Sequence, residues 1–85
     1  MMQVILSVKD IAAQAFGRPM FLPTAAVGVR SFRDEVNRQD ANNEMNKHPD
    51  DFELYELGSY DDSTGIIEVV TPRLVARAKD LKDVS

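Results

Sequence analysis

The chain contains no cysteine and no tryptophan, and only one of its 85 residues is histidine. Without cysteine it has no disulfide framework and no thiolate metal site, which fits a reducing compartment such as the cytoplasm. No apolar run approaches the roughly 18 residues needed to span a bilayer, so we expect no membrane partner. The short apolar run of residues 4–6 has no basic region ahead of it, which argues against a secretory signal.

Signatures of catalysis and of metal binding are missing as well. The sequence has no glycine-rich phosphate loop, no nucleophile elbow and no metal-binding histidine pair. His48, which precedes Pro49, has no evident partner for acid–base work and is expected in a turn. The run Asp61-Asp62-Ser63-Thr64 offers oxygens to a hard cation, but it lacks the EF-hand spacing and suits a hairpin turn. We therefore expect a protein that is not an enzyme and that holds no metal ion or cofactor.

The charge of the chain is unbalanced in sign and in position. The formal net charge of −4 argues against a simple polybasic nucleic-acid-binding protein. Residues 50–68 hold seven acids and no base, however, and the rest of the chain holds ten bases and seven acids. Such segregation creates a local positive surface on an acidic protein. The alternative is that the acidic run only solvates an exposed hairpin.

The length of the chain predicts a single domain over residues 1–85 with a modest core. A chain of this size buries only about 60–65 % of the surface that its unfolded form exposes. Its 44 % of hydrophobic residues is ordinary for a globular domain. A second subunit would add buried surface, so we expect a homo-oligomer, and in particular a dimer.

The first half of the chain predicts two strands and a helix. Alternating residues 4–8 indicate a strand, residues 10–18 a loop, and residues 20–22 a short strand at a sheet edge because proline flanks it on both sides. Thr24 is expected to cap a helix, which contributes about 1 kcal/mol. The apolar stripe of that helix comprises Ala25, Val29, Phe32 and Val36.

The second half of the chain predicts a loop, a hairpin and a second helix. Residues 39–51 are rich in turn formers, and residues 52–60 and 66–70 form the hairpin. Thr71 and Pro72 are expected to begin the last helix, with an apolar stripe of Leu74, Ala78 and Leu81. The predicted fold is α+β, a mainly antiparallel sheet with two helices in the order β-β-α-β-β-α.

The first strand of the expected hairpin has apolar side chains on both faces. Phe52 and Leu54 share one face, and Tyr55 and Leu57 share the other. One face should pack on the helices. We expect the other face to pack on a second subunit.

Basic and aromatic residues form the remaining constellation. Proteins that hold single strands without sequence preference combine basic grooves for phosphates with aromatic platforms for bases. The candidate platforms are Phe16, Phe21, Tyr55 and Tyr60, whereas Phe32 is expected in the core. The candidate phosphate ligands are Arg18, Arg30, Arg33, Arg38, Arg73, Arg77 and Lys79, with Lys82 nearby. The alternative is a solvated helix surface held by pairs such as Arg30 with Asp34.

One stretch of the chain also resembles a known family. After His48-Pro49-Asp50 come Phe52, Leu54, Gly58, Tyr60-Asp61 and Gly65, and residues 30–37 supply an Arg-x-Phe-x-Asp helix. This pattern resembles the small non-structural protein of gokushovirus-like microviruses, which are phages with single-stranded DNA genomes. The resemblance implies a protein made in the cytoplasm of the infected bacterium, absent from the capsid and associated with single-stranded DNA.

Two functions follow as hypotheses. The first is a non-enzymatic single-stranded DNA-binding protein that acts in phage genome replication or packaging. The alternative is an acidic interaction protein that modulates a viral or host replication enzyme through its hairpin.

Overall fold

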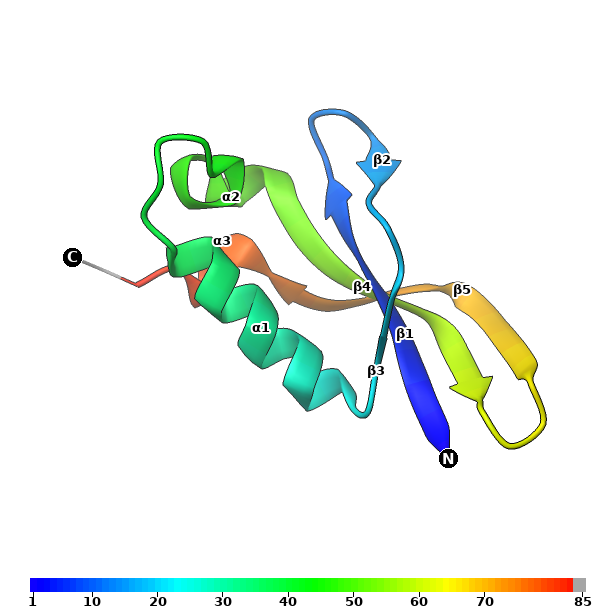
Figure 1. Cartoon of the computed structure of the whole chain (residues 1–85). Helices are drawn as coiled ribbons and strands as arrows, with labels where there is room; N and C mark the ends of the chain where they lie inside the picture. The colour runs from blue at the N-terminus through cyan, green and yellow to red at the C-terminus, as the bar shows by residue number, and fades with distance from the viewer. Residues whose placement is uncertain (84–85) are drawn as a thin grey trace.

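The computed structural model describes residues 1–83 and shows an antiparallel sheet with its helices gathered on one face (Figure 1). The elements are β1 (Met2–Asp10), β2 (Ala15–Phe16), β3 (Met20–Leu22), α1 (Ala25–Asn37), α2 (Glu44–Lys47), the 3-10 helix η1 (Pro49–Asp51), β4 (Phe52–Asp61), β5 (Ile66–Arg77) and α3 (Ala78–Leu81). This arrangement confirms the α+β class and the antiparallel sheet. No helix among residues 1–83 is long and apolar enough to cross a membrane.

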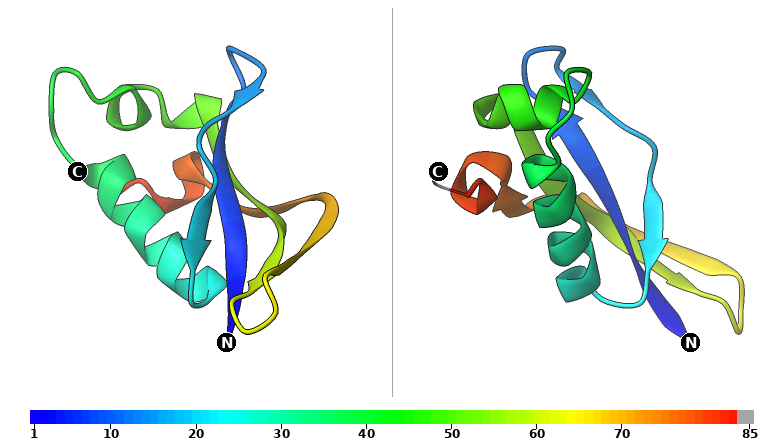
Figure 2. Two further views of the ribbon diagram at one scale, coloured as in Figure 1. Left: turned by 45° about the vertical axis from the view of Figure 1, so that its right-hand side comes forward. Right: turned by 60° about the vertical axis from the view of Figure 1, so that its left-hand side comes forward.

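Strand β1 is the centre of the sheet. The strand order is β2-β1-β4-β5, and β3 joins β1 on the same side as β2. Strand β3 pairs with β1 alone within residues 1–83, so the edge position predicted from its two flanking prolines is confirmed. The hairpin β4–β5 reaches beyond the helices, as Figure 2 shows from two sides.

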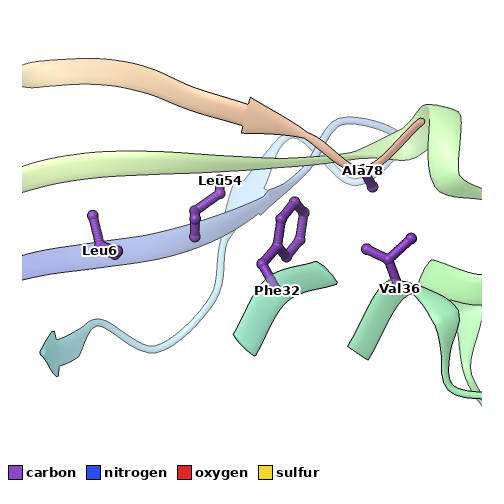
Figure 3. Packing of buried hydrophobic residues seen from close by; sticks show 5 residues of the cluster. All are labelled: Leu6, Phe32, Val36, Leu54 and Ala78. Atoms are coloured by element: carbon purple, nitrogen blue, oxygen red, sulfur yellow. The ribbon is translucent and has the colours of Figure 1, made fainter. Parts of the chain in front are cut away.

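The core lies between α1 and the face of the sheet that carries Leu6 and Leu54, which we call the inner face. Phe32 and Val36 of the predicted α1 stripe are buried against it, together with Ala78 at the start of α3 (Figure 3). Burying side chains of this size stabilises a fold by about 1.5–3 kcal/mol each. The side chain of Thr24 accepts a hydrogen bond from the Val27 N–H, so the predicted cap is confirmed.

Gly28 brings α1 close to the sheet. A Cβ atom at this position would overlap the Leu6 side chain and touch that of Leu22. Glycine costs about 1 kcal/mol of helix propensity relative to alanine. Here that cost is offset by a close approach of the helix to β1.

A bulge in β4 changes which side chains share a face. Residues Gln3 to Ile5 pair with Tyr60 to Gly58, whereas Leu6 pairs with Glu56, so Leu57 is the extra residue. In a regular strand, Tyr55 and Tyr60 would point to opposite faces because their spacing is odd. The bulge places both on the face opposite the core, which we call the outer face.

The predicted last helix is wrong over most of its length. Strand β5 continues to Arg77, and only residues 78–81 are helical. Thr71 and Pro72 are a good local start signal, but residues 73–77 gain a ladder with β4 instead. Pairing with a neighbouring strand outweighs such a signal because it provides hydrogen-bond partners for the backbone N–H and C=O groups and packs the side chains together. Leu74 therefore lies in a strand and is exposed.

The two predicted loops contain short elements. Ala15 and Phe16 form β2 within the region 10–18, and α2 and η1 form within 39–51. Asn43 caps α2 through a bond from the Met45 N–H. These elements are four residues long or shorter, so they leave little periodic signal in the sequence.

Candidate nucleic-acid interface

The outer face of the sheet carries the four predicted aromatic platforms, and no helix among residues 1–83 covers it (Figure 2). Each ring is fixed by the strand register. On one side of β1, Phe16 of β2 stands opposite Lys9, and Phe21 of β3 stands opposite Ile5. Tyr55 and Tyr60 stand opposite Ser7 and Gln3 on the other side of β1. Directly opposed residues of antiparallel strands share a face, so all four rings project to the same side.

The first ring pair joins Phe16 and Tyr55. Their centroids are 5.5 Å apart and their planes meet at 78°, which is an edge-to-face contact. The ammonium of Lys9 lies 5.5 Å from the Phe16 ring centroid and 5.8 Å from that of Tyr55. This is a cation–π arrangement, and it places one positive charge directly beside two rings.

The second ring pair joins Phe21 and Tyr60. The centroid distance is 5.6 Å and the interplanar angle is 84°. Measured along β1, the two pairs are about four residues apart, or roughly 13 Å. The outer face therefore presents two aromatic ring pairs, one after the other along β1.

A partly buried hydrogen bond holds the segment that carries Phe16. The hydroxyl of Ser7 donates to the carbonyl of Gly17 at 2.9 Å, and the Gly17 N–H donates to the Val8 carbonyl. Ser7 is fully buried. Removing a buried hydroxyl from its partner leaves an unsatisfied group, which costs about 1–3 kcal/mol. The first ring pair thus rests on a fixed backbone rather than on a free loop.

Two of the predicted phosphate ligands are already paired with carboxylates. Arg77 donates to Glu53 at 3.2 Å, and Arg73 donates to Glu56 at 2.7 Å. The Tyr55 hydroxyl also donates to Glu53, at 2.9 Å, and this bond is the main reason that the pKa of Tyr55 is raised. Glu53 thus links a platform ring to an arginine, and either arginine must exchange a carboxylate before it binds a phosphate.

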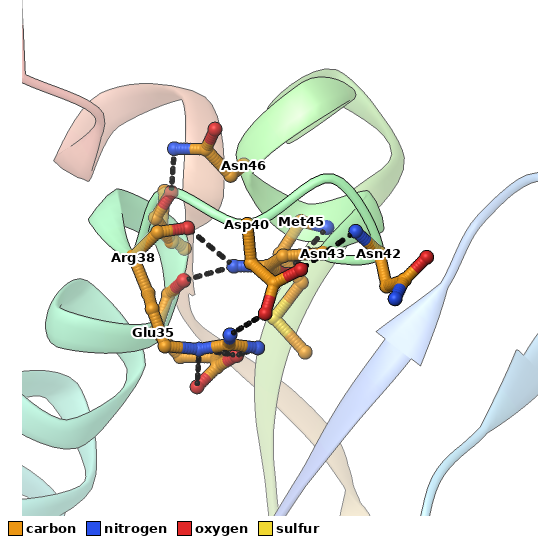
Figure 4. Close-up of polar contacts among 8 residues, drawn as sticks. Glu35, Arg38, Asp40, Asn42, Asn43, Met45 and Asn46 are labelled. Carbon is orange, nitrogen blue, oxygen red and sulfur yellow. Dashed lines mark hydrogen bonds and ion pairs between the residues drawn. The ribbon is translucent and has the colours of Figure 1, made fainter.

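Arg38 is held in a structural cluster. Its guanidinium donates to Glu35 and to Asp40 at the end of α1, as Figure 4 shows. The hydrogen bond with Glu35 is the main cause of the raised pKa of Arg38. The buried Asn43 side chain completes the turn by donating to the carbonyls of Glu35 and Arg38. Arg38 is therefore engaged in stabilising the turn from α1 to α2.

Arg30 and Arg33 lie on the exposed side of α1. Within residues 1–83 neither forms an ion pair, and the alternative pair of Arg30 with Asp34 is not formed. Because α1 covers the inner face, these two bases lie on the other side of the sheet from the rings. Lys79 lies on α3, on the helical side of the sheet. Arg18 lies in the exposed segment between β2 and β3, the two short strands that carry Phe16 and Phe21.

Lys9 is the functional candidate that the sequence did not reveal. Lys9 follows Ile5 and Ser7 at every second position of β1, so these three residues share the face opposite Leu6. That signal was in the strand pattern. Its contact with two rings, however, depends on the pairing of β1 with both β2 and β4.

The acidic run is largely neutralised by its neighbours. Glu53 and Glu56 pair with arginines, and the terminal ammonium of Met1 pairs with Asp61 and Asp62. The Asp61 carboxylate also accepts from the Ser63 N–H, which is the main cause of its lowered pKa. Within residues 1–83, only three acids of the run remain outside ion pairs, and they are Asp50, Asp51 and Glu68.

A family model described as Phage ORF5 protein matches residues 3–81. The chain belongs to this family. No curated protein and no solved structure matches it. The family hit confirms that the chain is a phage protein, as the resemblance implied, and the assignment to gokushovirus-like microviruses stays a prediction.

Proposed function

We propose that this phage protein is a non-enzymatic single-stranded DNA-binding protein that acts in genome replication or packaging in the cytoplasm of the infected bacterium. The observation that carries the proposal is the outer face, where two aromatic pairs and Lys9 lie on a surface that no helix of the described residues covers. A surface of this kind suits unpaired bases, which expose their flat faces for stacking.

The exposure of the rings supports this role. Phe16 is 43 % exposed and Phe21 is 46 % exposed, although both belong to residue types that are usually buried. Stacking on a base is worth about 1–3 kcal/mol per ring and works with every base. Binding through these rings is therefore expected to show little sequence preference.

The phosphate contacts are expected to be few. Lys9 and Arg18 lie beside the rings, and neither forms an ion pair within residues 1–83. Arg77, which lies on the same face, can join when a phosphate replaces Glu53, whereas Arg73 lies on the inner face with Glu56. With about three phosphates neutralised, the logarithm of the binding constant should fall against the logarithm of salt with a slope of about −2.

The test is fluorescence anisotropy with labelled single-stranded and double-stranded oligonucleotides over a series of salt concentrations. We expect Phe16→Ala and Phe21→Ala each to weaken single-strand binding by about five- to a hundredfold, which corresponds to the loss of one stacking platform. Val27→Ala is the matched control, because Val27 is similarly exposed but lies on α1. Equal affinity of the parent and both phenylalanine variants would refute the proposal.

The second candidate is an interaction protein that docks on a basic surface of a viral or host replication enzyme. The observation that favours it is the net charge of −4, with Glu68 of the acidic run outside any ion pair within residues 1–83. Neutral substitution of Glu53, Glu56, Asp61 and Asp62 should slow association with such a partner. Loss of a captured replication enzyme in this variant, with no DNA binding by either form, would favour this candidate.

A further inference from the structure

Strand β5 is a free edge of the sheet. It pairs with β4 on one side and with no other strand among residues 1–83. An edge strand presents unpaired N–H and C=O groups, and a long apolar one is a template for another strand. β5 has 12 residues, and its large exposed apolar side chains are Ile66, Ile67, Val69, Val70 and Leu74.

A bulge divides β5 into two flanks. Val69 pairs with Gly58 and Arg73 pairs with Glu56, so residues 70–72 stand opposite Leu57 alone. These extra residues shift the alternation of side chains along β5, so residues at an odd spacing across the bulge share a face. Ile67 and Leu74 both lie on the outer face, opposite the two tyrosines of β4. Glu68 and Arg73 both lie on the inner face, so each flank offers one apolar and one charged side chain, and the two charges are opposite.

We propose that β5 pairs in antiparallel fashion with β5 of a second copy of this chain, about a two-fold axis normal to the sheet. In the register that we assign, Glu68 stands opposite the partner's Arg73, and Ile67 stands opposite the partner's Leu74. A two-fold interface repeats each contact, so two ion pairs and two apolar pairs form. Opposite charges and apolar residues that face each other across strands both stabilise such a ladder.

The local geometry is compatible with this register. Antiparallel strands require opposed residues to share a face, and both assigned pairs do so. Glu68 has no ion pair within residues 1–83, and Arg73 holds Glu56 through a single nitrogen. A guanidinium has five N–H donors, so it can accept a second carboxylate. Pro72 has no N–H, but it lies in the bulge between the flanks.

The assembly would also change the outer face. Rotation about an axis normal to the sheet keeps the outer faces of both copies on the same side. The four ring pairs of a dimer would then line one continuous surface. The predicted contact through the second face of β4 gives way to an edge contact here, because Tyr55 of that face already packs on Phe16.

The mass in solution tests the assembly. Sedimentation or light scattering at tens of micromolar should give twice the 9.5 kDa of one chain. Ile67→Lys places a charge on the edge and should yield a monomer with unchanged circular dichroism. Ile11→Lys is the matched control, because Ile11 is exposed in the turn after β1, and it should remain dimeric. A monomeric parent would overturn the proposal.

Cross-linking tests the register, and the absence of native cysteine makes it clean. Ile67→Cys combined with Leu74→Cys should form a covalent dimer on mild oxidation, because directly opposed residues come close enough for a disulfide. Within one chain the two positions stand opposite Tyr60 and Tyr55 and are about 13 Å apart, so a disulfide within one chain is excluded. Ile67→Cys alone should not cross-link, and cross-linking of that single variant at the same rate would refute this register. No DNA enters either experiment, so single-strand binding by a monomer would leave the proposed function standing.

Discussion

The two faces of the sheet use the same strands for different purposes. On the inner face, Leu6 and Leu54 are fully buried under α1. On the outer face, Phe16 and Phe21 remain nearly half exposed although they are larger and equally apolar. Strand alternation sends neighbouring residues of β1 to opposite sides, so one strand serves the core and the ring-bearing surface together. The comparison teaches that apolar character alone does not identify a core position in a chain this small.

The largest expected effect separates the faces by stability. Phe32→Ala removes a buried ring from the core and should lower the free energy of unfolding by about 3–5 kcal/mol. Phe16→Ala should cost only about 0.5–1.5 kcal/mol from the lost ring contact, beyond a small change in burial. Urea denaturation of both variants checks this difference. Equal losses would mean that the outer rings are a second core.

Gly58 tests whether the bulge creates the outer face. A Cβ here would overlap the carbonyl of Glu68, and the φ of 157° lies outside the range that other residues prefer. Gly58→Ala should therefore lower the free energy of unfolding by about 1–3 kcal/mol. It should also weaken the nuclear Overhauser contacts between Phe21 and Tyr60. Gly17→Ala is the control, since its Cβ would meet only an ordinary contact at 3.4 Å.

Salt dependence tests which side of the sheet meets the phosphates. Lys9→Ala combined with Arg18→Ala should reduce the magnitude of the log–log salt slope by about 1.4, which is two single-strand phosphate contacts. Arg30→Ala combined with Arg33→Ala should leave the slope nearly unchanged, because α1 lies on the other side. The reverse result would move the phosphate track to α1, as the sequence alone suggests.

Glu53 sharpens the comparison on the outer face itself. Glu53→Gln removes the charged acceptor of the Tyr55 hydroxyl, so the raised pKa of Tyr55 should fall toward its ordinary value. Ultraviolet titration of the phenolate measures this in a Tyr60→Phe background, where Tyr55 is the remaining tyrosine. The same change releases Arg77, and single-strand affinity should rise modestly at low salt and little at high salt. An unchanged phenolate titration would contradict the assigned hydrogen bond.

The smallest effect concerns the turn on the helical side. The pKa of Asp40 is lowered, first by the hydrogen bond from the Asn42 N–H and then by Arg38. A lowered folded pKa gives stability that is present above the unfolded pKa and is lost as pH falls through the folded value. Asp40→Asn should thus be slightly less stable than the parent at neutral pH and equal to it in acid. Thermal unfolding over this pH range checks the convergence, and a gap that persists in acid would assign the effect to packing.

The sequence by itself determined the elements that depend on local signals. The cap at Thr24, the apolar stripe through Phe32 and Val36, the edge strand at residues 20–22 and the α+β class were all readable. These features rest on hydrogen bonds and periodicities within a few residues, so no distant partner is needed to fix them. The four aromatic rings were also identified, although their shared face was not.

Only the tertiary structure decided how distant residues meet. Pairing with β4 turned the expected helix after Thr71 into strand, because the ladder outweighs a local start signal. The bulge at Leu57 brought Tyr55 and Tyr60 to one face, and cross-strand register placed Lys9 between two rings and tied Arg73 to Glu56. Register depends on contacts between segments up to about 60 residues apart, and no local pattern encodes where a bulge shifts it.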